Sequence, residues 1–219
     1  MAESNNHIAT VIKAYDSRIV KAYCWGRFKI LRLSFLEEIG QYLPASGTVL
    51  DIGCGFGLFS LYYAKRFPDL NILGIDHNPK RIKMARHAAE KLGLTNVRYE
   101  TGDAVSLSVD DSLDGAYMLD IIHHIPWDAV QNMLKQLHTR LKPEGILIVK
   151  DVNVRPAYKR WFTLIMDKLM DLKGRVHYWD QYDLMKLFHQ TGFQTHYHSM
   201  VDILPYPHIL YICRKNKEA

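Results

Sequence analysis

The chain contains 219 residues, 48% of them hydrophobic, which suffices to bury one full core and favours a single domain over separate catalytic and regulatory domains. The formal charge of +5 and the pI near 9.0 are a modest surplus that indicates an acidic partner only weakly. Cys24, Cys54 and Cys213 match neither a zinc cluster nor a disulfide framework, which is typical of a reducing compartment. With no apolar run of about eighteen residues and no signal-peptide core at the polar start, we expect a soluble, cytoplasmic protein without a transmembrane segment.

The amino-terminal residues 8–42 carry apolar side chains at helical spacing, among them Ile19, Phe28 and Phe35. This spacing predicts one or two covering helices ahead of the first strand. Basic residues crowd the same segment, namely Lys13, Arg18, Lys21, Arg27, Lys29 and Arg32.

Residues 48–57 combine a buried strand with a glycine-rich turn. Val49, Leu50 and Ile52 suit a strand buried on both faces, and glycines then follow at positions 53, 55 and 57. Alternating glycines let the backbone turn sharply and approach a bound molecule closely. A nicotinamide or flavin fingerprint needs its third glycine three residues after the second, where this chain has Leu58. The loop therefore predicts contact with a cofactor other than a dinucleotide.

Acidic residues follow the next two predicted strands. Residues 71–75 form an apolar run that ends in Asp76, and an acid at this strand end can accept both hydroxyls of a ribose. A helical pattern over 79–92 leads to a strand at 96–100, after which Asp103 could accept an amino hydrogen of an adenine. Three acidic strand ends in order, Asp51 being the first, predict a nucleoside site.

Further apolar runs at 113–119 and 145–151 alternate with helical patterns at 57–67, 79–92 and 127–141. Such alternation implies right-handed crossovers and a parallel sheet with helices on both faces. After a helix near 180–191, the runs 193–200 and 207–214 are joined by a connection too short for a crossover helix, so they should pair antiparallel. The expected fold class is α/β, a Rossmann-like, doubly wound, mostly parallel seven-stranded sheet with a reversed last strand.

Residues 153–176 interrupt this core, with apolar residues such as Trp161, Ile165 and Leu169 set among lysines and arginines. We interpret the segment as an amphipathic lid. It can be a plain packing element, an apolar cap over a lipid-like or polyketide-like molecule, or a docking face for an acyl carrier protein or an anionic membrane surface.

The chain resembles the class I S-adenosylmethionine-dependent methyltransferases of small molecules, through Val49–Gly57, Ile72–Asp76, Gly102–Asp103 and Leu141–Gly145. In that family the glycine loop lies under the methionine and sugar, the second acid holds the ribose, and the third loop frames the adenine. The resemblance, over about residues 45–214, implies S-adenosyl-L-methionine as cofactor and S-adenosyl-L-homocysteine as product. Glu144 stands where the family often has the first of two glycines in the turn before the fifth strand. This departure affects a turn and not the cofactor site. Carried over, the cofactor-binding roles fall on Asp51, Gly53, Cys54, Gly55, Gly57, Asp76, His77, Arg81, Gly102, Asp103, Ala104 and Asp120.

The family also places a substrate-facing loop after the fourth strand, here residues 119–126. Asp120 would lie near the amino-acid end of the cofactor. His123 or His124 could remove a proton from a substrate hydroxyl, because neutral imidazole is available near pH 7, and we favour His124. Either histidine can equally be an ordinary polar residue that orders the turn. At the amino terminus, Tyr15, Tyr23, Trp25 and Arg27 either close over the cofactor or only pack on the sheet.

The chain has neither a nucleophile elbow nor the metal-ligand spacing H-E-x-x-H, so hydrolase and metalloenzyme functions and a bound metal are not expected. The loop after the fourth strand also lacks the Asn or Asp, two prolines and aromatic of enzymes that methylate exocyclic amines of nucleic-acid bases. We therefore predict methyl transfer from S-adenosylmethionine to a small apolar, lipid-like or polyketide-like metabolite, most readily at oxygen, with carbon or nitrogen as alternatives. The alternative from another class is a catalytically inactive regulatory or scaffold protein that binds the cofactor.

The expected organisation is one methyltransferase domain over residues 1–219. It comprises a helical cap at 1–44, a cofactor-binding half at 45–152, the amphipathic lid at 153–176 and a substrate half at 177–219.

Overall fold

The computed structural model describes residues 2–104, 112–152, 177, 179–200 and 208–216. Its strands form a seven-stranded sheet in the order β3-β2-β1-β4-β5-β7-β6. The predicted α/β fold class with a reversed last strand is confirmed, whereas the amphipathic lid at 153–176 and the hairpin connection at 202–207 lie outside the described residues. The chain divides into two units, residues 1–115 and 116–219, and the expected single domain stays a prediction.

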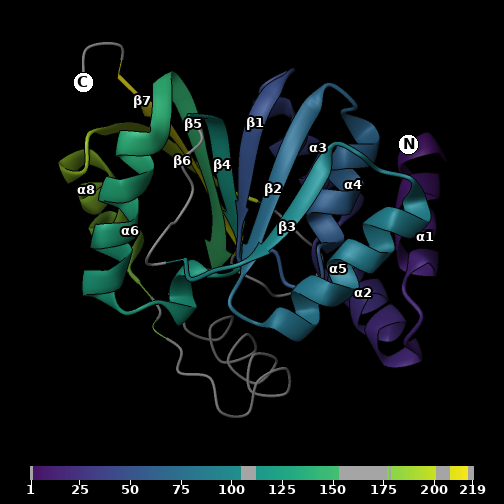
Figure 1. The fold of residues 1–219 in the computed structure, drawn as a ribbon. Coiled ribbons are helices and arrows are strands. Elements are labelled where there is room, and N and C mark those ends of the chain that lie inside the picture. The colour runs from purple at the N-terminus through teal and green to yellow at the C-terminus, as the bar shows by residue number, and fades with distance from the viewer. Residues whose placement is uncertain (1, 105–111, 153–176, 178, 201–207, 217–219) are drawn as a thin grey trace. The chain divides into compact units, whose positions relative to one another are not determined.

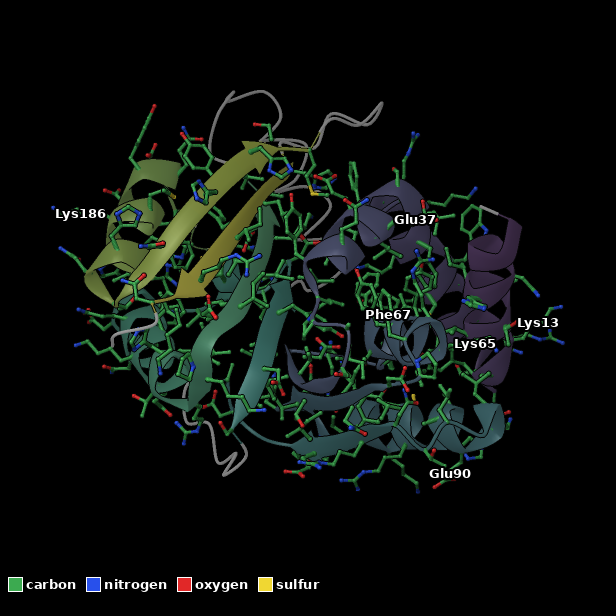
Figure 2. The ribbon with its side chains drawn as sticks, turned by 90° about the horizontal axis from the view of Figure 1, so that it is seen from above. Lys13, Glu37, Lys65, Phe67, Glu90 and Lys186 are labelled. Atoms are coloured by element: carbon green, nitrogen blue, oxygen red, sulfur yellow. The ribbon has the colours of Figure 1, made fainter. Side chains whose placement is uncertain are left out.

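The first unit begins with three helices, α1 (Ala2–Ala14), α2 (Arg18–Ile30) and α3 (Leu33–Tyr42), so the prediction of one or two covering helices was wrong. The breaks have local causes. Ser17 has an extended backbone and its hydroxyl accepts the N–H of Val20, so a new helix begins there. Leu31 ends α2 with a non-helical backbone (φ −94°, ψ 86°), and Arg32 is extended. Lys13 points outward from α1 in Figure 2, while α1 packs on α4 and α5.

The sheet of this unit is parallel, as the apolar runs predict. β1 (Gly47–Ile52) pairs with β2 (Leu70–Asp76), which pairs with β3 (Val97–Thr101), and the three strands lie side by side in Figure 1. α4 (Leu58–Arg66) and α5 (Pro79–Leu92) are the crossover helices and pack against β2 and β3. Asn78 caps the start of α5 and Gly93 ends it in the left-handed conformation. These elements bring the ends of β1, β2 and β3 to one edge.

The second unit contains most of β4 (Leu113–Leu119), the short helix η1 (Ile122–His124), α6 (Trp127–Arg140), β5 (Leu141–Val152), α8 (Gln181–Gln190), β6 (Phe193–Ser199) and β7 (His208–Lys215). β7 runs antiparallel to both β5 and β6, which confirms the predicted hairpin. β5 begins at Leu141 rather than at residue 145, because the turn around Glu144, at φ 63°, lies within the strand. In Figure 2 Lys186 points outward from α8.

Candidate active site

The glycine-rich turn between β1 and α4 needs the conformational freedom of glycine. Gly53, Gly55 and Gly57 have φ values of 72°, 58° and 76°, in the left-handed region that other residues avoid. A Cβ at Gly57 would lie 2.5 Å from the Tyr99 hydroxyl oxygen, whereas a Cβ at Gly55 would have no heavy atom within 4 Å. The turn is therefore packed tightly at Gly57 and open at Gly55.

The carboxylate of Asp76 holds this turn from the end of β2. Its Oδ2 accepts the backbone N–H of Gly55 at 3.0 Å and its Oδ1 accepts that of Asn78 at 2.8 Å. Arg81 Nη1 and His77 Nδ1 each lie 3.9 Å from one of its oxygens. The side chain is buried, so its position is set before any ligand arrives.

Asp51 and Cys54 lie buried beside the same turn. The backbone N–H groups of Gly53 and Cys54 both donate to the carbonyl of Ile75 at 2.9 Å, which ties the turn to β2. Burial, followed by the negative charges of Asp51 and Asp76, raises the pKa of the Cys54 thiol well above its ordinary value. Cys54 is therefore a neutral, small side chain and not a nucleophile.

The third predicted loop also belongs to this edge. Gly102 follows β3 and donates its N–H to the carbonyl of Asp76 at 3.1 Å. Asp103 is exposed and Ala104 half-buried. The first unit thus collects eleven of the predicted cofactor residues at the ends of three neighbouring strands, leaving only Asp120 in the second unit.

Two residues of the amino-terminal segment, Tyr15 and Tyr23, contact Phe56 of the glycine turn. The Tyr15 hydroxyl donates to the Phe56 carbonyl at 2.9 Å, and the Tyr23 ring meets the Phe56 ring edge-on at 5.3 Å. Trp25, in contrast, is 59% exposed, and Arg27 lies over Phe59 of α4. Of the four residues proposed to close over the cofactor, Tyr15 and Tyr23 touch the turn.

In the second unit, Lys150 of β5 contacts Asp120 through both its backbone carbonyl and its side-chain ammonium. Asp120 has a left-handed backbone with φ 57°, and its N–H donates to the Lys150 carbonyl at 2.8 Å. Its carboxylate forms an ion pair with the Lys150 ammonium, which is fully buried. A buried ammonium is costly unless it is paired with an opposite charge. The ion pair therefore fixes the positions of both side chains.

The next residue of β5, Asp151, holds His123. Its Oδ2 accepts the backbone N–H of His123 at 3.1 Å, and its Oδ1 lies 2.5 Å from the ring Nδ1. His123 is buried, whereas His124 is exposed, with ring centroids 4.1 Å apart. Sequence reasoning missed both Lys150 and Asp151. Two charged residues in succession at the end of an otherwise apolar strand, residues 146–152, were the available signal.

A family model described as "Methyltransferase domain" matches residues 49–145. The chain is 31% identical over 150 residues to a 2-methyl-6-phytyl-1,4-hydroquinone methyltransferase of Synechocystis, covering 64% of this chain and 46% of the relative. It is 30% identical over 128 residues to a ubiquinone biosynthesis O-methyltransferase of Acinetobacter baylyi, covering 58% of this chain and 52% of the relative. The chain thus spans about half the length of these curated relatives.

Among solved structures, a SAM-dependent methyltransferase from Methanosarcina mazei superposes with a TM-score of 0.66 at 23% identity, over 83% of this chain and 98% of that one. This likeness concerns the fold. Within the described ranges, no helix is long and apolar enough to cross a membrane.

The fold is an α/β sheet with acidic residues gathered where β1, β2 and β3 end. With the match to the methyltransferase-domain model over residues 49–145, these features make the chain similar to the class I S-adenosylmethionine-dependent methyltransferases. The residues present fit the cofactor of that family, S-adenosylmethionine. The buried Asp76 carboxylate suits ribose hydroxyls, and the space beside Gly55, which a Cβ would enter, suits a closely approaching ligand.

Proposed function

We propose that this protein transfers the methyl group of S-adenosylmethionine to an oxygen of a small phenol or hydroquinone that carries an apolar chain. The observation that carries the donor is the buried Asp76 carboxylate, which is bonded to the glycine turn at the edge where β1, β2 and β3 end. When bound, the cofactor supplies an electrophilic methyl group on a sulfonium. The chain then has to orient the acceptor and exclude water.

Support for the acceptor class comes from the relatives. One is named for a hydroquinone with a phytyl chain and another for O-methylation in ubiquinone biosynthesis. The first name favours a phenolic ring with an apolar tail among the lipid-like and polyketide-like metabolites that the sequence indicates, and the second favours oxygen as the acceptor atom. Transfer to carbon or nitrogen, and an acceptor bound to a carrier protein, are the alternatives.

We propose His123 as the group that takes the proton of the acceptor hydroxyl. Because the carboxylate of Asp151 accepts from Nδ1, the neutral ring carries its hydrogen there and its lone pair on Nε2. The proton would move from the hydroxyl to Nε2 as the oxygen bonds to the methyl carbon and the bond from that carbon to sulfur breaks, which would leave the electron pair on the sulfur of S-adenosylhomocysteine. His124 was favoured from the sequence, but its side chain is exposed, whereas His123 is buried beside the Asp151 carboxylate, so His123 is the stronger candidate.

Cofactor binding is tested by calorimetric titration with S-adenosylmethionine and S-adenosylhomocysteine. Asp76→Asn should weaken both about tenfold or more, because a hydrogen bond to a charged group is lost from a preformed site. Asp69→Asn, at an exposed aspartate just before β2, is the matched control and should bind as the parent does. Equal affinities for the two variants would refute the ribose assignment.

Turnover is tested with labelled methyl donor against a panel of prenylated phenols, hydroquinones and their methyl ethers. Labelled product from a free hydroxyl but not from its ether supports O-methylation. Product with the label on ring carbon would move the acceptor atom to carbon. Tight cofactor binding with no labelled product from any member of the panel would favour the regulatory or scaffold alternative.

A further inference from the structure

Helix α2 presents two different faces. Val20, Cys24 and Phe28 recur at a spacing of four and are buried, so they form the inner face. The outer face carries large apolar side chains that are normally covered. Ile19 is 82% exposed and Trp25 is 59% exposed, while Tyr23 is 37% exposed. Tyr23 also packs against the Phe56 ring, so Ile19 and Trp25 are the large apolar side chains of this helix that are most open to a partner.

Positive charge flanks this apolar surface. The helical period places Ile19 and Tyr23 about 120° around the helix from Arg18, Trp25 and Lys29, with Ala22 and Gly26 between the two groups. The Lys29 ammonium lies 5.3 Å from the centroid of the Trp25 ring. No acidic residue occurs from position 17 to position 36, which also contains Lys21, Arg27 and Arg32. The outer face of α2 therefore combines exposed apolar side chains with charged side chains that are all basic.

We propose that the outer face of α2 docks on an anionic membrane surface. Apolar side chains that insert to the level of the lipid headgroups, with cations beside them to meet anionic lipids, are the features by which a helix lies in a membrane interface. A tryptophan has an apolar body and a polar N–H, which suits the same boundary. The positive charge of α2 is complementary to anionic lipid, and its exposed apolar side chains would be buried in the membrane interface.

This inference goes beyond methyl transfer and does not depend on it, since docking requires neither cofactor nor acceptor. It also has a consequence for the proposed function. An acceptor with a long apolar chain partitions into the bilayer, so a protein held at the surface meets it at a higher local concentration.

The test is co-sedimentation of the full chain, without cofactor, with vesicles of phosphatidylcholine alone and of phosphatidylcholine mixed with phosphatidylglycerol. The parent should bind the mixed vesicles and lose them in high salt. Arg18→Gln with Lys29→Gln should lower the partition coefficient about 25-fold, since each cation near an anionic surface contributes about a fivefold factor. Lys80→Gln with Lys83→Gln removes equal charge from exposed positions of α5 and should have a smaller effect.

The apolar contribution is tested with Ile19→Ser, which should weaken binding to mixed vesicles at unchanged charge. Tyr182→Ser, at a 62% exposed position of α8, is the control and should bind as the parent does. Unchanged thermal unfolding of Ile19→Ser shows that the loss is not a folding defect.

Absence of parent binding to the mixed vesicles would overturn the proposal. So would equal losses from the α2 and α5 charge variants, because binding would then follow net charge alone. Self-association of the parent that Ile19→Ser abolishes, without vesicle binding, would identify a second copy of the chain as the occupant and would likewise refute it.

Discussion

Asp151 contacts His123 at two atoms, accepting the backbone N–H on Oδ2 and facing the ring Nδ1 with Oδ1 at 2.5 Å. The N–H of Val152 donates to the same Oδ1 at 2.6 Å, so the carboxylate itself has a fixed orientation. A carboxylate held in this way selects one tautomer of the imidazole and one orientation of its ring. His123 therefore has the arrangement of a positioned base, with Asp151 as its positioning residue.

The variant Asp151→Asn should lower kcat about 100-fold or more, because an amide does not select the tautomer in the way that a carboxylate does. The dissociation constant of S-adenosylmethionine should stay near that of the parent. Steady-state kinetics over a range of pH provide the measurement, and His123→Gln should remove the acidic limb of the rate profile. Asp128→Asn, at an exposed position of α6, is the control. A parental kcat and pH profile in Asp151→Asn would show that the pair is only structural.

Lys150→Met should reduce the free energy of unfolding by about 3–5 kcal/mol, because it leaves the Asp120 carboxylate without the cation that pairs with it. Adding Asp120→Asn should recover part of this loss, since asparagine tolerates the left-handed backbone and carries no charge. Urea unfolding of the two single variants and the double variant measures the coupling. Additive losses would mean that the ion pair does not join these two residues in solution.

Gly55→Ala and Gly57→Ala should differ although both place an alanine at positive φ. The backbone conformation alone costs about 1–2 kcal/mol in each. Gly57→Ala should lose about 1–3 kcal/mol more, because its Cβ would overlap the Tyr99 hydroxyl. Gly55→Ala should instead keep most of its stability and lose affinity for S-adenosylmethionine. Thermal unfolding and calorimetric titration distinguish the two, and equal stability losses would contradict the described packing.

Tyr15→Phe should cost about 0.5–1.5 kcal/mol of stability, because the Phe56 carbonyl loses its hydroxyl donor. If the amino-terminal helices close over the cofactor, the affinity for S-adenosylmethionine should fall as well. Burial raises the pKa of this phenol well above its ordinary value, so the hydroxyl remains a donor across the assay range. Tyr182→Phe on the exposed face of α8 is the control. Loss of stability with unchanged affinity would leave these helices a packing role only.

Alkaline pH should destabilise the protein through its buried thiols. Burial raises the pKa of Cys24 from 9.0 to about 12, and that of Cys213 to about 12. The unfolded chain loses these protons near pH 9 while the folded chain keeps them, so the stabilisation is full below pH 9 and is lost as the pH rises toward 12. Cys24→Ala should therefore lose stability less steeply than the parent between pH 8 and about pH 10.5 in urea unfolding. Slopes equal to that of the parent would contradict the assignment to Cys24.

Local sequence patterns were sufficient to predict much of the fold of this protein. Strand periodicity predicted the sheet, the spacing of Gly53, Gly55 and Gly57 predicted the turn, and the short connection before β7 predicted the reversed strand. These features depend on residues close together in the chain, where backbone sterics and burial act directly. The amino-terminal helices show the limit of such reasoning, because a serine cap at Ser17 and the non-helical residues Leu31 and Arg32 divided a continuous apolar pattern.

Only the tertiary structure could decide which side chains meet. Asp151 and His123 are 28 residues apart, Lys150 and Asp120 are 30 apart, and Tyr15 and Phe56 are 41 apart. Such pairs depend on which strands are neighbours, on their register, and on the alternation that turns Lys150 and Asp151 to opposite sides of β5. The local motifs of the sequence thus carry its resemblance to the methyltransferases and to their cofactor site. The choice of His123 over His124 required the fold, because both are the same residue type in one loop and only packing buries one beside a carboxylate.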